Sequence, residues 1–167
     1  KKKPIKLIIP GQKPDKAYFL LAGYIVVYYI DQQGEIRVVR IACAEEIIAT
    51  DAFMQHGPSP LYIVAMRQAV YISISYDNMQ AIYREVEGVQ ELAVKTAANY
   101  QKLEMQRDIL VNKPMREKIL EFYSNKKDLL PAKRSPLKDA YIASYLRINI
   151  HTCRRVKNEM IADGVLI

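Results

Sequence analysis

The stretch that decides the fold is residues 138–162, which read KDAYIASYLRINIHTCRRVKNEMIA. Its apolar residues recur at spacings of three and four on both sides of a short break, which predicts helices over 138–147 and 150–162. Ala143 supplies the small residue needed where two short helices cross at a steep angle. The apolar contacts between the helices are expected from Ile142, Leu146, Ile148, Cys153 and Val156. This arrangement is that of a helix-turn-helix.

The second of these helices has two different faces. At about 100° per residue, Cys153, Val156 and Met160 fall on one side. The opposite side carries His151, Arg154, Arg155 and Asn158. Arginine and asparagine pair with guanine and adenine in the major groove of DNA, and cations also contact phosphates. We therefore predict a DNA-binding face, the alternative being an ordinary solvated face on a helical hairpin.

The net charge of +7 is concentrated near this element. Residues 1–110 hold 13 Lys and Arg against 12 Asp and Glu, whereas residues 111–167 hold 12 against 6. Basic charge gathered in one segment favours a partner with a phosphate backbone or an anionic membrane, although a solvated lysine-rich surface gives the same count. No stretch approaches the roughly 20 apolar residues of a membrane helix, and no signal peptide is expected. We predict a cytoplasmic protein without a membrane partner.

The first 76 residues predict strands. The β-prone runs are Ile5–Ile9, Tyr18–Ile30, Glu35–Ile41, Glu46–Thr50, Leu61–Met66 and Ala69–Ser75. Asp31–Gly34 is a turn signal between the second and third runs, which predicts a hairpin. Many short strands at even spacing favour a small β-sandwich or barrel over a βαβ fold.

Helices are expected after Tyr76. Asp77 is placed to cap a short helix over 78–85, and a long helical pattern then runs from Glu87 to about Val111. A 25-residue helix is roughly 37 Å long, more than a small β domain covers, so part of its stripe is expected to meet a second copy of the chain. The alternative is a helix that lies wholly on its own barrel. The predicted dimer contacts are Leu92, Thr96, Tyr100 and Leu103.

Proline at position 114 marks a boundary, because proline fits the first turn of a helix but not its interior. We expect a helix over 115–130 and a loop over 131–136. The predicted domains are a β sensor domain (1–86), a dimerisation helix (87–112) and a DNA-binding domain (113–167).

The chain resembles the Crp/Fnr family of bacterial transcription regulators. Residues 142–167 are similar to the family pattern Ile-Ala-x-x-Leu-Gly-x-Ser-x-x-Thr-x-x-Arg, followed by a Gly-Leu-Ile-like start of a wing. Residues 23–41 resemble its central hairpin, and residues 74–77 the exit into its helices. The resemblance implies an α+β fold: an N-terminal β-roll (a double-stranded β-helix of the cyclic-nucleotide-binding kind), a long dimerisation helix and a C-terminal winged helix-turn-helix. The sequence ends at Ile167, where the wing would begin, so we expect a truncated wing and no counterpart of the family's usual first helix.

The family's function implies a homodimer that binds palindromic double-stranded DNA and has RNA polymerase as a further partner. Arg155 matches the family's base-reading arginine and Thr152 its motif threonine. Lys138 and Arg134, just before the motif, are expected at phosphates. The family glycine is Arg147 here, so we expect either strain at Arg147, a different turn, or strain at Asn149.

The resemblance implies a small-molecule effector of unknown identity. Cyclic-nucleotide members carry a Gly-Glu pair and an Arg-Ser/Thr-Ala run, whereas this chain has Glu45-Glu46 and Ser59-Pro60-Leu61. A buried phosphate would therefore lack its arginine, so cyclic AMP is not expected to bind. Two cysteines are too few for an iron–sulfur cluster, and His56, which could ligate haem, is expected in a surface loop. We expect no cofactor, no metal and no enzyme activity.

Two other functional classes remain open at this point. An enzyme on a cupin-like barrel would need two or three histidines and a carboxylate at a metal, and the β segment has only His56. A ligand-binding module of the cyclic-nucleotide-binding fold could instead use its basic tail to dock an acidic protein. Metal analysis tests the first class, and salt-dependent duplex binding separates the second from a DNA-binding regulator.

Overall fold

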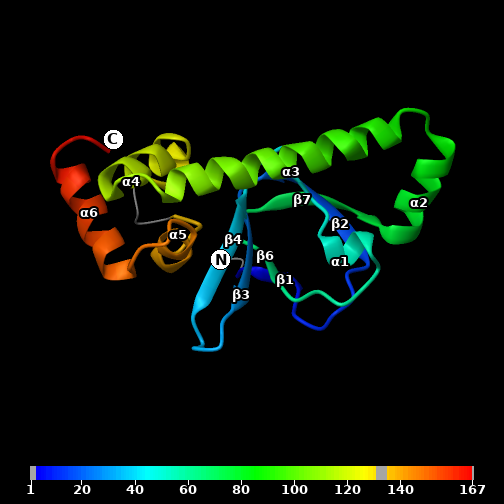
Figure 1. Cartoon of the computed structure of the whole chain (residues 1–167), viewed down its shortest axis with the longest axis horizontal. Helices are drawn as coiled ribbons and strands as arrows, with labels where there is room; N and C mark the ends of the chain where they lie inside the picture. The colour runs from blue at the N-terminus through cyan, green and yellow to red at the C-terminus, as the bar shows by residue number, and fades with distance from the viewer. Residues whose placement is uncertain (1–2, 131–134, 167) are drawn as a thin grey trace.

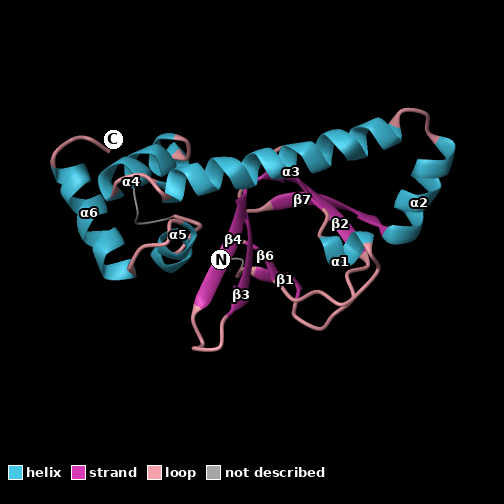
Figure 2. Cartoon of the chain, viewed as in Figure 1, coloured by secondary structure: helices cyan, strands magenta, loops and turns pink. Residues whose placement is uncertain are grey.

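The computed structural model describes residues 3–130 and 135–166. A β-roll occupies the middle of the molecule, helix α3 runs across it, and α4, α5 and α6 gather at one end (Figure 1). Figure 2 shows the strands in magenta, and within the described residues the last of them ends at Ser75. The strands are β1 (Ile5–Ile8), β2 (Lys16–Ala22), β3 (Ile25–Ile30), β4 (Ile36–Ala42), β5 (Ile47–Ile48), β6 (Tyr62–Ala65) and β7 (Val70–Ser75). The helices are α1 (Asp51–Met54), α2 (Tyr76–Glu85), α3 (Val89–Val111), α4 (Met115–Ser124), the 3-10 turn η1 (Lys127–Leu129), α5 (Asp139–Tyr145) and α6 (Ile150–Ala162).

The strands form two antiparallel sheets, in the orders β1-β6-β3-β4 and β5-β2-β7. The predicted hairpin is confirmed as β3–β4, with Val26 opposite Ile41. Its turn is held by Asp31, whose Oδ1 accepts hydrogen bonds from the amides of Gln33 and Glu35, each at 2.9 Å. β4 lies at the edge of its sheet.

Two predictions in the roll are wrong. The run 18–30 is not one strand: it divides into β2 and β3, which lie in different sheets. Gly23, between them, has φ +80°, and a Cβ there would lie 2.8 Å from the Cα of Ala69, so only glycine fits this crossing. The run 46–50 gives only the two-residue strand β5, and it is followed by the unpredicted helix α1, which Thr50 caps.

The helices follow the sequence more closely. α6 has the predicted bounds, and α3 begins two residues later than expected. α2 is capped by the hydroxyl of Ser75, which accepts from the amide of Asn78, rather than by Asp77. The helix expected over 115–130 ends at Ser124 and is followed by the separate turn η1.

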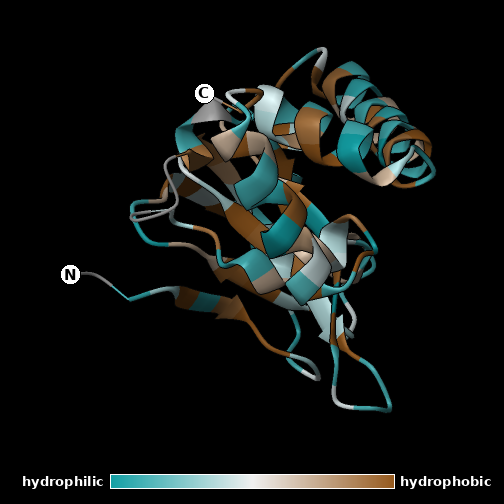
Figure 3. Cartoon of the chain, turned by 90° about the vertical axis from the view of Figure 1, so that its left-hand side faces the viewer, coloured by the Kyte–Doolittle hydropathy of each residue, from teal (hydrophilic) through white to brown (hydrophobic). Residues whose placement is uncertain are grey.

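The first four residues of β3, in the four-stranded sheet, are buried on both faces. Alternate residues such as Ile25 and Val27 point into the roll, where they join a core with Leu20 and Ile63. Their neighbours Val26 and Tyr28 point outward and join a second core, which continues into α4, α5 and α6. The helices show both hydrophobic and hydrophilic residues along their length (Figure 3). Over the described ranges, no helix is both long and apolar enough to cross a membrane.

Candidate nucleic-acid interface

α5 and α6 are joined by the four residues Leu146–Asn149. Arg147 adopts φ +55°, the left-handed conformation that favours glycine. Asn149 instead has an extended backbone with φ −65°, and its side chain caps α6 by accepting from the amide of His151 at 2.8 Å. The strain expected at this turn therefore lies at Arg147, where the resembling family has glycine, and not at Asn149.

The two helices meet through small and apolar side chains. Ile142, Ala143 and Leu146 of the α5 side are buried. They share a core with the inward side chains of α6, which are Cys153, Val156 and Met160. Ile148 is only partly buried against the same core. Burial raises the pKa of Cys153 to about 11, so this thiol is protonated near neutral pH and acts as a small apolar residue.

The opposite side of α6 is open to solvent. The exposed side chains there are His151, Arg154, Arg155 and Asn158, and Thr152 beside them is half-buried. Arg154 pairs with Asp139 at 2.9 Å and Arg155 with Glu159 at 2.7 Å. Surface ion pairs of this kind contribute about 0–1 kcal/mol, so either guanidinium can exchange its carboxylate for another anion or acceptor at little cost.

The other predicted phosphate contacts lie before α5. Lys138 is exposed at the start of α5. It lies in the helical unit formed by α4, α5 and α6, which also carries the open face of α6. Arg134 lies outside the described residues.

Two lysines of the basic segment have structural roles that the sequence did not indicate. The side chain of Lys157 is only 4% exposed, and its Nζ bonds to Asp139 at 2.6 Å. Buried Lys118 donates to the carbonyls of Val111, at 2.7 Å, and Leu146, at 3.5 Å, where α3 and α5 end. A cation is favourable at a helix C-terminus. Part of the positive surplus therefore holds the helices together and is not free for a partner.

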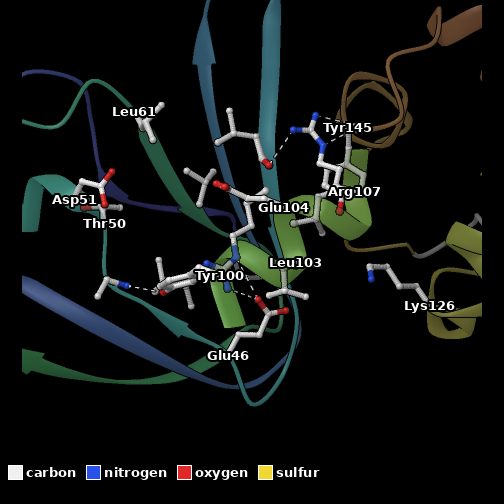
Figure 4. Close-up of a pocket in the computed structure, with 16 residues that line it drawn as sticks. Glu46, Thr50, Asp51, Leu61, Tyr100, Leu103, Glu104, Arg107, Lys126 and Tyr145 are labelled. Atoms are coloured by element: carbon white, nitrogen blue, oxygen red, sulfur yellow. Dashed lines mark hydrogen bonds and ion pairs between the residues drawn. The ribbon is translucent and has the colours of Figure 1, made fainter. Parts of the chain in front are cut away.

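The roll contains a cavity of about 270 Å³ between β4, α3 and the helical unit (Figure 4). Its charged lining residues are Arg40, Glu46, Asp51, Glu104, Arg107 and Lys126. These charges balance in number, so the cavity has no strong preference for one sign of ligand. Tyr100 and Leu103 close it from α3, and Tyr145 closes it from α5.

Tyr100 fastens α3 to the wall of this cavity. Its hydroxyl donates to the carbonyl of Ile47 and accepts from the amide of Ala49 at 3.1 Å. The guanidinium of Arg40 lies over its ring, 4.0 Å from the centroid, and forms an ion pair with Glu46. Burial raises the pKa of Tyr100, so the phenol stays protonated and remains a donor.

Comparison with known proteins finds a family model that matches the β-roll and solved structures that share the fold of the chain. Residues 6–86 match the family model of the cyclic nucleotide-binding domain. No curated protein matches the chain. Solved structures of similar fold include FixK2 from Bradyrhizobium japonicum (TM-score 0.77, 15% identity, covering 98% of this chain and 83% of that one). CooA from Carboxydothermus hydrogenoformans, solved as a mutant, is also similar (TM-score 0.66, 21% identity, 98% and 75%). So is a CRP-family transcriptional regulator from Thermus thermophilus (TM-score 0.75, 15% identity, 98% and 84%). The fold is that of CRP-family regulators.

The β-roll of this chain departs from the motifs of cyclic-nucleotide members at Glu45 and at Ser59–Leu61, as the sequence comparison predicts. Glu45 stands where those motifs have glycine and adopts φ +69°. The carboxylate of Glu46 is already occupied, because it pairs with Arg40 and accepts from the amide of Cys43 at 2.9 Å. Ser59 is buried, and its hydroxyl donates to the carbonyl of Leu61 and accepts from the Leu61 amide, each at 3.1 Å.

His56 lies in the exposed loop after α1, as predicted. Its ring stacks on Tyr76 with centroids 4.2 Å apart, and its backbone adopts φ +56°. Within residues 3–130 and 135–166, no group of three or more His, Cys, Asp and Glu side chains is arranged to hold a metal ion.

The residues predicted at a dimer interface do not share one environment. Leu92 is 55% exposed, and half-buried Thr96 donates its hydroxyl to the carbonyl of Leu92 at 2.8 Å. Tyr100 and Leu103 instead face the chain's own roll, so in this structure their contacts lie within one chain. A second, solvent-facing stripe of α3 that the periodicity did not separate contains Val94, Met105 and Ile109.

Proposed function

We propose that the protein is a homodimeric transcription regulator that binds specific sequences of double-stranded DNA through α5 and α6, acting as a helix-turn-helix. The observation that carries the proposal is the open face of α6. It gathers two arginines, an asparagine and a histidine on a helix whose other side is anchored by buried Cys153, Val156 and Met160. Bidentate donors on a rigid, exposed helix are what major-groove reading requires.

The dimer proposal rests on the exposed apolar residues of α3. Val94, Met105 and Ile109 are 68%, 60% and 55% exposed. Apolar side chains repeated along one side of a helix of about 34 Å are typical of a helix that packs on a second one. The proposed partner is the α3 of a second copy, which would contact the side of the helix that carries Val94, Met105 and Ile109.

We also propose that cyclic AMP is not the effector. The carboxylate of Glu46 is already paired, and the segment Ser59–Leu61 offers no arginine to a cyclic phosphate. Desolvating a phosphate without a partner is costly. Calorimetric titration should show no binding at micromolar cyclic AMP, and a micromolar affinity, about −8 kcal/mol, would contradict this part of the proposal.

The function itself is tested by selecting duplexes from a random pool with the purified chain. A DNA-binding dimer should enrich one site made of two inverted half-sites. A pool that stays random after repeated rounds, with binding that depends on salt alone, would overturn sequence-specific regulation and favour a basic tail that binds polyanions or an acidic protein.

A further inference from the structure

The outer edge of β4 is bonded by side chains of the helical unit. β4 is the last strand of its sheet, so half of its backbone groups have no strand partner. Ser144, in the last turn of α5, fills this gap: its hydroxyl accepts from the amide of Val38 at 2.8 Å and donates to the carbonyl of Ile36 at 2.7 Å. One hydroxyl thus replaces two bonds of a neighbouring strand and holds α5 against the roll.

Arg107 of α3 also bonds to the edge of β4 and to the end of α5. Its guanidinium donates to the carbonyls of Val38 at 2.8 Å and Val39 at 3.2 Å, both in β4. It also donates to the carbonyl of Tyr145, at 3.1 Å, where α5 ends, and lies 4.7 Å from the centroid of the Tyr145 ring. In the part of the chain that the structure describes, no carboxylate forms an ion pair with Arg107. The Arg107 guanidinium therefore joins β4, α3 and α5 through hydrogen bonds to backbone carbonyls.

We call these bonds of Ser144 and Arg107 the β4-edge contact. Packing around it is apolar and continuous. The ring centroids of Tyr28 in β3 and Tyr141 in α5 are 5.8 Å apart. One hydrophobic core runs from the outer face of the roll into the helices. α6 packs mainly on α5 and α4, at the end of the molecule away from the roll (Figure 1). The β4-edge contact therefore lies on the side of α5 that faces the roll and leaves the open face of α6 uncovered.

We propose that Ser144 and Arg107 are positioning residues through which the roll holds α6 in the orientation that binds DNA. This inference rests on the proposed function. A dimer must present two α6 helices at a fixed separation, so freedom of the helical unit relative to the roll reduces the binding-competent fraction. Fixing that orientation before binding raises affinity by lowering the ordering cost, and adds no contact with the DNA.

The test compares Ser144→Ala with Ser144→Thr, which keeps the hydroxyl, and with Ser124→Ala as a matched control. Ser124 is exposed at the end of α4, on the same helical unit. Two quantities are measured in the full chain: the hydrogen-exchange rate of the Val38 amide, and the affinity for the selected duplex and a scrambled duplex at two salt concentrations.

Ser144→Ala should exchange the Val38 amide faster and bind the selected duplex about 3- to 10-fold more weakly. The slope of affinity against salt should not change, because no phosphate contact is lost. Ser144→Thr should restore both quantities, and Ser124→Ala should match the parent. If Ser144→Ala does not fold, Arg107→Gln, which keeps a donor, is compared with Arg107→Met in the same way.

Unchanged or tighter binding of the selected duplex by Ser144→Ala overturns the inference, and so does a weaker binding that Ser144→Thr fails to restore. If the parent protein binds no duplex, the proposed function fails and the positioning role fails with it. Val38 exchange in the variants then shows whether the β4-edge contact still holds the helical unit to the roll.

Discussion

Arg155 carries the prediction that separates base reading from simple attraction to DNA. Its side chain is 65% exposed, and its bond to Glu159 is a surface pair that is easily exchanged. A guanidinium that pairs with guanine O6 and N7 contributes to one base position only. Arg155→Ala should cost roughly 1–3 kcal/mol on the selected duplex and relax the preference at one position of each half-site.

Lys138→Ala is the matched comparison, since exposed Lys138 is assigned to a phosphate. It should weaken selected and scrambled duplexes alike and reduce the salt slope by about one unit. Equal weakening of both duplexes by Arg155→Ala would make Arg155 a phosphate contact and remove it from the base-reading set.

Arg147 predicts a gain in stability. A left-handed conformation costs a non-glycine residue roughly 1–2 kcal/mol, and glycine avoids this cost. About half of the gain is lost again, because the unfolded chain has more conformational entropy with glycine at this position. Arg147→Gly should therefore raise the free energy of unfolding by up to about 1 kcal/mol in urea denaturation. Arg147→Ala is the control, because it loses the 3.6 Å contact with Asp108 but keeps the strain. A glycine variant no more stable than the alanine variant would show that the turn is not strained.

At the scale of the elements, the α5–α6 junction predicts a pH dependence. Burial raises the pKa of Asp139, but the hydrogen bonds from Lys157 and Arg154 outweigh it and hold the pKa below its ordinary value. A carboxyl with a lowered folded-state pKa stabilises above its unfolded pKa of about 3.9, and that stability is lost as pH falls through the folded value. Unfolding free energy should therefore drop below about pH 4 in the parent.

Asp139→Asn should be less stable at neutral pH by about 3 kcal/mol, because the buried Lys157 ammonium loses its counter-charge, and its stability should fall less in acid. Asp163→Asn is the control, since Asp163 and its partner Arg116 are both more than half exposed. Equal pH profiles for the parent and Asp139→Asn would show that Asp139 is not the titrating group.

The sequence predicted those elements whose signal is local. α6 combines an asparagine cap with a regular apolar period, and the β3–β4 hairpin has a polar turn of fixed length, so both were found. The division at Gly23 was missed because β-prone composition does not show where a chain passes from one sheet to the other. α1 was missed because a four-residue helix is too short to show a period.

The candidate site shows the same limit. The open face of α6 follows from the helical period alone. The Ser144 and Arg107 bonds join residues 106 and 69 positions from Val38, and no local pattern reports them. On α3 the period was read correctly, but apolar residues lie on both sides of the helix, so the period could not decide which side meets the roll.

At the scale of the whole molecule, the exposed stripe of α3 predicts the oligomeric state. Val94 and Met105 lie about three turns apart on one side of the helix. Val94→Glu combined with Met105→Glu should give monomers in light scattering, because burying two carboxylates between apolar helices is unfavourable. Ile5→Glu, at an exposed apolar residue of β1, is the control that should leave the dimer intact. A double variant that stays dimeric would exclude this face of α3.

The central claim is that two copies of the chain present two α6 helices to two half-sites of one DNA duplex. The most direct measurement is the affinity and stoichiometry for the selected palindrome, compared with a version that has half a helical turn inserted between its half-sites. Half-sites read by one dimer lie about 34 Å apart on the same side of the duplex, and the insertion places them on opposite sides. We predict two chains per palindrome and a fall to the affinity of scrambled DNA after the insertion. Equal affinity for both duplexes would contradict the account.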